Sequence, residues 1–156
     1  VGPSSATNNS LAKYDGTTGK LLKNGAVIGT DVQAYDADTT KNDVANTFSK
    51  AQRGSITALT DAGSISTDMA LNNFFSVTLG GNRALANPTN IVAGQSGSFF
   101  ITQDGTGSRT LSYGSYFDFV GGTAPTLTTT ASAVDRVDYI ARTTTSLQCV
   151  WSGALS

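Results

Sequence analysis

The sequence from residue 74 to residue 151 consists of short segments in which apolar and polar residues alternate, each ended by a turn signal. In the first of them Phe75, Val77 and Leu79 fall on one face of a strand. Threonine, serine and glycine make up more than a third of the chain, and no helix of three turns can be recognised. Strands of five to seven residues with closely spaced turns are typical of sandwiches and related all-β folds. We therefore expect an antiparallel β-sandwich, jelly-roll-like in form, over residues 47–156.

Two pairs of these segments are expected to form hairpins. Residues 98–102 and 109–113 flank the glycine-containing loop 104–107, whereas residues 137–142 and 147–151 flank a run of threonine and serine. Strand-like segments joined by connections of this kind usually pair with each other in an antiparallel manner. These two expected hairpins are the reason that the predicted sandwich is antiparallel.

Residues 1–46 differ from the rest, because their apolar clusters hold only three or four residues and cannot bury a face within one chain. The clusters are separated by dipeptides that favour tight turns, Asp15-Gly16 and Asn24-Gly25. All five lysines precede residue 51 and all five arginines follow it, which marks a candidate boundary. We expect an extended segment over 1–46 that packs on other copies of the chain in a homotrimer, with one helical turn at 42–46.

The charge and length of the chain exclude several classes of protein. Only 13% of its 156 residues are charged and the net charge is −1, so no basic footprint for nucleic acid is present. No apolar run approaches the length that crosses a membrane. The chain begins at Val1 without a methionine or signal peptide, which we expect of a fragment or a processed product.

The chain has no histidine, and all eleven acidic residues are aspartates. Catalysis by Ser-His-Asp or Cys-His is therefore excluded, as are zinc sites built on histidine. The remaining acid–base candidates are three aspartate pairs, which we interpret as solvated loop carboxylates: Asp36 with Asp38, Asp61 with Asp68, and Asp135 with Asp138. The oxygen-rich stretch 36–43 lacks the glycine and glutamate of an EF-hand. The sequence thus predicts no enzyme, no metal site and no cofactor, and an irregular or shared ion site at 36–43 is the weaker alternative.

The stretch from Tyr113 to Phe119 most resembles a binding site. Tyr113, Tyr116 and Asp118 combine aromatic rings with an acid, a set that can stack on a sugar and bond its hydroxyl groups. The alternative is that Phe117 and Phe119 fill the core, while Tyr116 and Asp118 only face water. Two residues further along share one strand face, and we expect them in the core or at a subunit interface: Cys149 and Trp151.

The first forty residues resemble modules of the tail fibres and related appendages of tailed bacteriophages. The resemblance lies in the opening Gly2-Pro3-Ser4-Ser5-Ala6-Thr7, in Ala12-Lys13-Tyr14-Asp15-Gly16-Thr17-Thr18-Gly19-Lys20, and in residues 31–38. The opening carries one serine more than the family pattern. Residues 51–151 resemble more loosely the β domains near the ends of phage structural proteins. The resemblance implies a virion appendage that is a homotrimer, and it transfers no catalytic residue.

Three roles follow from that resemblance as expectations. The first is a fibre tip on the virion that binds a host surface glycan or protein through Tyr113, Tyr116 and Asp118. The second is a purely structural segment of a fibre shaft or collar, in contact with other virion proteins. The third is a spike or decoration protein on the capsid exterior. The long parallel β-helix of phage depolymerases needs more residues than this chain has.

Overall fold

The computed structural model describes residues 10–14, 22–27 and 51–155. It divides the chain into two units, Val1–Gln52 and Arg53–Ser156, whereas the sequence suggested a boundary between residues 46 and 47. None of the described segments is a helix long and apolar enough to span a membrane. The predicted helical turn at 42–46 and the oxygen-rich stretch 36–43 lie outside the described residues.

The first unit contains one antiparallel pair of strands. β1 (Ser10–Tyr14) pairs with β2 (Leu22–Val27), and Tyr14 lies opposite Leu22. The turn predicted at Asn24-Gly25 is wrong, because both residues lie inside β2. An Asn-Gly dipeptide favours a turn but does not force one, and here Asn24 pairs with Ala12 of β1 beside an irregularity in the register.

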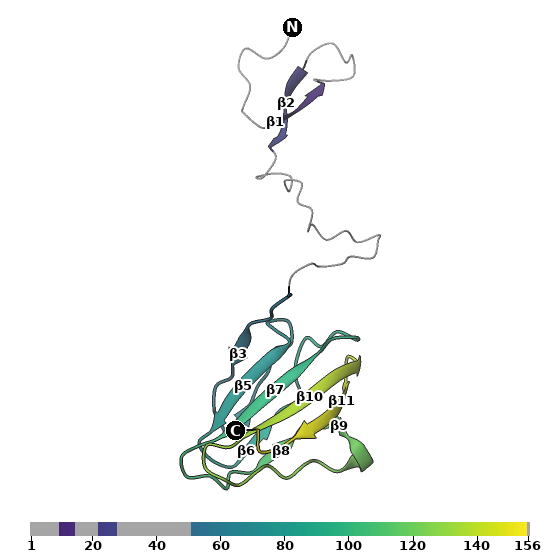
Figure 1. The fold of residues 1–156 in the computed structure, drawn as a ribbon. Helices are drawn as coiled ribbons and strands as arrows, with labels where there is room; N and C mark the ends of the chain where they lie inside the picture. Colours follow the sequence, from purple (N-terminus) through teal and green to yellow (C-terminus); the bar gives the residue numbers. More distant parts are fainter. Residues whose placement is uncertain (1–9, 15–21, 28–50, 156) are drawn as a thin grey trace. The chain divides into compact units, whose positions relative to one another are not determined.

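The regular structure of the second unit is almost entirely β-strand, in a larger mixed sheet and a smaller parallel sheet (Figure 1). The larger sheet has the order β3-β5-β7-β10-β11-β9 and the smaller one the order β4-β6-β8. The bounds of these elements are β3 (Ile56–Ala58), β4 (Ser64–Ile65), β5 (Phe74–Leu79), β6 (Arg83–Leu85), β7 (Ser96–Gln103), β8 (Leu111–Tyr113), β9 (Phe117–Phe119), the 3₁₀ turn η1 (Val120–Gly122), β10 (Val134–Thr143) and β11 (Ser146–Ser152). The predicted β-rich class is confirmed.

The strands from β3 to β8 wind in parallel rather than in hairpins. Successive strands alternate between the two sheets, and β3, β5 and β7 pair in parallel, as do β4, β6 and β8. The chain therefore makes three short parallel circuits before β9. The predicted hairpin of residues 98–102 with 109–113 is wrong, since β7 and β8 belong to different sheets. Between them, the Asp104 carboxylate accepts hydrogen bonds from the Gly107 amide and the Arg109 guanidinium, and this widened turn carries the chain across to the other sheet.

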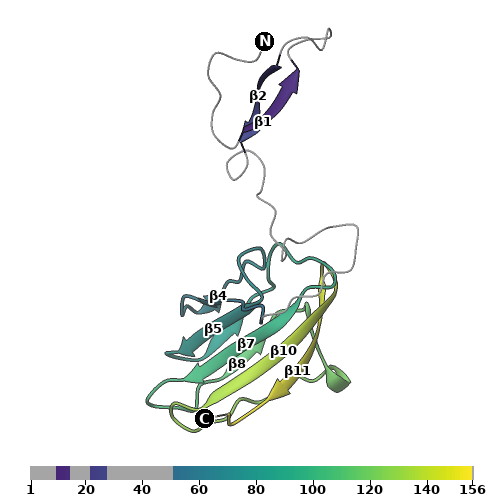
Figure 2. The same cartoon turned by 45° about the horizontal axis from the view of Figure 1, so that its top comes forward.

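The last three strands complete the larger sheet. β10 pairs antiparallel with both β7 and β11, so the hairpin predicted from residues 137–142 and 147–151 is confirmed. β9 then pairs in parallel with β11 at the sheet edge, where the green η1 turn lies in both views (Figure 2). The sheet is thus antiparallel only in its β7-β10-β11 part, and an antiparallel arrangement throughout was a wrong expectation.

One buried core draws side chains from both sheets. Phe75, Val77 and Leu79 of β5 are buried, which confirms their predicted shared face. They join Ile65 and Leu85 of the smaller sheet in a single apolar cluster. The cluster also includes residues of the later strands, among them Phe99, Ile101, Phe117, Val137, Tyr139, Leu147 and Cys149. Cys149 is therefore a core residue, as expected, whereas Trp151 on the same strand is 38% exposed.

The aspartates proposed as solvated pairs have separate structural roles. Asp135 is only 2% exposed, and its carboxylate accepts hydrogen bonds from the backbone amides of Thr128 (2.6 Å) and Ala154 (2.9 Å). The prediction that it lies in a solvated loop is wrong, because it holds the C-terminal segment to β10. Asp61 forms an ion pair with Arg83 at 2.7 Å, and the hydrogen bond from that guanidinium lowers the pKa of the carboxyl group.

Candidate functional site

Tyr113 is partly buried against the core, and its hydroxyl group is fully enclosed. Its ring meets Phe117 and Phe119 edge to face, with ring centroids 5.6 and 4.8 Å apart. The phenol oxygen is buried without a hydrogen-bond partner, and this burial raises the pKa of the hydroxyl group. A receptor could reach the Tyr113 hydroxyl only after this aromatic cluster had opened.

Tyr116 is half-buried at the turn that leads into β9. Its backbone amide donates a hydrogen bond to the Asn87 side chain (2.9 Å), and its carbonyl accepts one from the Leu147 amide (2.7 Å). The side chain packs against the core with part of its surface exposed. Tyr116 is therefore fixed in place by its backbone while its side chain remains partly accessible.

Asp118 points away from the core, because alternation along β9 buries Phe117 and exposes its neighbour. Its carboxylate accepts a hydrogen bond from the Ser146 hydroxyl at 2.5 Å, and it makes no ion pair with any residue that the structure describes. Of the three residues predicted to bind a receptor, Asp118 alone lines an open groove on the outer face of the larger sheet.

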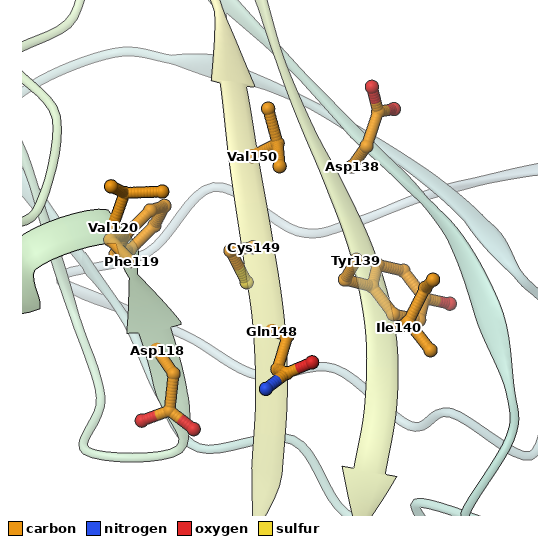
Figure 3. Close-up of a pocket in the computed structure, with 9 residues that line it drawn as sticks. All are labelled: Asp118, Phe119, Val120, Asp138, Tyr139, Ile140, Gln148, Cys149 and Val150. Carbon is orange, nitrogen blue, oxygen red and sulfur yellow. The ribbon is translucent and has the colours of Figure 1, made fainter.

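This groove has a volume of about 480 Å³ and crosses β9, β11 and β10. Figure 3 shows Gln148 on the central strand, between Asp118 on one side and Ile140 on the other. The register agrees, since Gln148 pairs with Asp118 in one direction and with Ile140 in the other. The residues that line the groove are Asp118, Phe119, Val120, Asp138, Tyr139, Ile140, Gln148, Cys149 and Val150.

The lining combines exposed aliphatic side chains with carboxylate groups that already accept hydrogen bonds from neighbouring side chains. Three aliphatic side chains in the lining are exposed to solvent: Val120 (85%), Val150 (60%) and Ile140 (59%). Exposed apolar side chains of monomeric proteins are usually scattered singly, whereas these three line one groove. Asp138 is bonded to the Ser98 hydroxyl (2.6 Å) and the Arg136 guanidinium (3.0 Å). Of the two carboxylates that line the groove beside these aliphatic side chains, Asp138 has an ion pair and Asp118 has none among the described residues.

The Cys149 thiol is buried beneath this groove and is unreactive. Burial raises the pKa of the thiol to about 12, and the nearby Asp118 charge adds to the effect. The thiolate is the nucleophilic form of cysteine, so the group is almost wholly unreactive at neutral pH. In the part of the chain that the structure describes, no three aspartate or cysteine residues gather to hold a metal ion. The arrangement can therefore offer apolar contact and hydrogen bonds.

Sequence reasoning missed the aliphatic residues of the groove. Ile140 and Val150 occupy outward positions in segments whose inward residues, Tyr139 and Cys149, were correctly read as strand. The available signal was the presence of large aliphatic residues on both faces of the strand. A strand with one face in water normally alternates apolar and polar residues, so this departure indicates that the outer face is not simply solvated.

Comparison of the chain with protein-family models, with curated proteins and with solved structures gave no match. The site is therefore interpreted from its own residues.

Proposed function

We propose that this chain is part of a virion appendage of a tailed bacteriophage, a tail fibre or fibre tip, which assembles as a homotrimer and adheres to a host surface receptor. The observation that carries the proposal is the set of appendage motifs in residues 1–40. The β-rich second unit is compatible with it, because short strands around a dense core suit an exposed appendage that must keep its fold outside the cell.

We interpret the second unit as a sandwich of mixed strands, in place of the antiparallel jelly-roll-like form. Support comes from the single core to which Ile65 and Leu85 of the smaller sheet and Phe75 and Phe99 of the larger sheet contribute. Two sheets that share one buried layer of side chains are the defining feature of a sandwich. The scaffold would hold β9 and its neighbours rigidly for contact with a partner.

Assembly into a homotrimer is supported by two features of the chain. Its charged fraction of 13% is about half of that in a typical soluble domain, which leaves little charge repulsion between copies. The second feature is the group of exposed aliphatic side chains at the groove, which a contact between copies would cover.

Tyr116 offers a host receptor a partly exposed aromatic side chain whose backbone is held in place. The fluorescently labelled trimer is expected to bind host cells saturably and non-host cells not at all. Tyr116→Ala is expected to weaken that binding about tenfold while the trimer persists, since an accessible aromatic side chain often dominates a contact. Ser112→Ala, an exposed change on β8, serves as the control and should bind normally.

Other results would point to the other roles. Equal or absent binding across strains would contradict adhesion to a host receptor. Electron microscopy of labelled virions would then distinguish a structural shaft or collar segment from a spike on the capsid.

A further inference from the structure

The outer face around the groove carries two opposite charges beside exposed aliphatic side chains. Asp118 lies on the edge strand β9, Ile140 and Arg142 lie on β10, and β11 runs between these two strands. Arg142 is exposed, and it forms no ion pair or side-chain hydrogen bond with the residues that the structure describes. By the register, Gln148 lies between Asp118 and Ile140, and the exposed side chain of Val150 lies two residues further along β11.

Asp118 and Arg142 do not pair with each other in the part of the chain that the structure describes. Gln148 pairs with Asp118 on one side and with Ile140 on the other, so two strand spacings, roughly 10 Å, separate β9 from β10. Arg142 lies a further two residues along β10. The Asp118 carboxylate and the Arg142 guanidinium, which have no ion pair among the described residues, therefore lie at two separate places on this face.

We propose that this face is the contact between copies of the chain, arranged head to tail in a ring of three. In that ring Asp118 of each copy meets Arg142 of the next, and the side chains of Ile140, Val150 and Val120 are buried beside them. A head-to-tail contact that closes into a ring joins two different patches of each copy. The negative Asp118 and the positive Arg142 mark two such patches, and their opposite charges attract across the contact. The inference rests on the homotrimer of the proposed function, and it assigns Asp118 to assembly, which leaves Tyr116 for the host.

Charge reversal in the full chain tests this contact directly. Asp118→Arg alone and Arg142→Asp alone each place like charges opposite each other in the ring, so each is expected to shift the protein from trimer to monomer in light scattering coupled to size exclusion. The double variant Asp118→Arg/Arg142→Asp restores opposite charges across the contact and is expected to recover the trimer.

A matched pair provides the control for a general effect of charge. Asp118→Arg/Thr78→Asp keeps the first change and places the compensating acid at an exposed position on β5 of the same sheet, where no recovery of the trimer is expected. Ile140→Glu should reduce the fraction of trimer at least about tenfold, because it places a charge within the buried contact. Leu71→Glu, at an exposed apolar site outside the groove, should leave the trimer unchanged.

The remaining outcomes would overturn the inference. A dimer as the largest species of the unchanged protein excludes the ring of three, and recovery of the trimer by the control pair excludes a specific contact. If both single variants remain trimers, the homotrimer stands and this contact is wrong. If Ile140→Glu leaves the trimer intact and weakens binding to host cells, the groove contacts the host instead.

Discussion

Replacing Phe99 with alanine is expected to lower the free energy of unfolding by about 3–5 kcal/mol, the usual loss when a buried phenylalanine is truncated. The Phe99 ring is 2% exposed and lies at the centre of the aromatic core. It stacks on Phe75 at 5.3 Å and meets Tyr139 at 5.5 Å and Phe117 at 5.9 Å. Its removal would leave a cavity bounded by rings from three other strands. Urea denaturation at a fixed protein concentration measures the loss.

Phe100 is the matched control for this experiment. It is the next residue on β7, has the same size and lies half-buried on the outer face of the sheet. Phe100→Ala should cost clearly less than Phe99→Ala, because only the inner ring is enclosed on all sides. Equal losses for the two variants would contradict the assignment of the core to the inner face.

Gly97→Ala is expected to destabilise the second unit by about 3 kcal/mol or more, through overpacking and lost hydrogen bonds. A Cβ at this position would lie 1.7 Å from the Asn73 carbonyl oxygen, a backbone atom that cannot move aside alone. That oxygen accepts hydrogen bonds from the Ser98 amide (3.1 Å) and the Tyr139 hydroxyl (2.9 Å). The substitution therefore pushes β5 and β7 apart where the two strands begin.

Gly63 separates this steric effect from the general cost of replacing glycine. No atom lies within 4 Å of the Cβ that Gly63→Ala would add, so its melting temperature should stay near that of the wild type. Thermal unfolding followed by circular dichroism compares the two variants. A Gly97→Ala protein as stable as the Gly63→Ala protein would show that the close approach of Asn73 is not required by the fold.

Local alternation in the sequence predicts the strands of this protein but not all of their partners. The inward positions of β5 follow from Phe75, Val77 and Leu79, and the β10–β11 hairpin follows from a short connection between two apolar segments. The same alternation fits a parallel or an antiparallel neighbour equally well. The pairing of β5 with β7 depends on contacts such as that of Gly97 with Asn73, which are distant in sequence and carry no local signal.

Only the part of the candidate site that depends on local alternation could be predicted from the sequence. Asp118 is exposed on β9 as its alternation with Phe117 and Phe119 indicates, and that position needs only local information. Tyr113 looked equally accessible from the sequence, yet its ring fills the space between Phe117 and Phe119. The groove itself arises because β9 pairs in parallel with β11 at the edge of the sheet. Strands that pair in parallel are not joined by a short turn, so the sequence contains no local signal for this pairing.

The mass of the protein in solution tests the central claim, that the chain works as a homotrimeric appendage. Light scattering coupled to size exclusion, at micromolar concentration, is expected to give three times the chain mass of 16.0 kDa. The exposed aliphatic groove and the unpaired charges of Asp118 and Arg142 would then be covered by neighbouring copies. A single species of 16.0 kDa at that concentration would contradict the homotrimer and, with it, the proposed contact between copies.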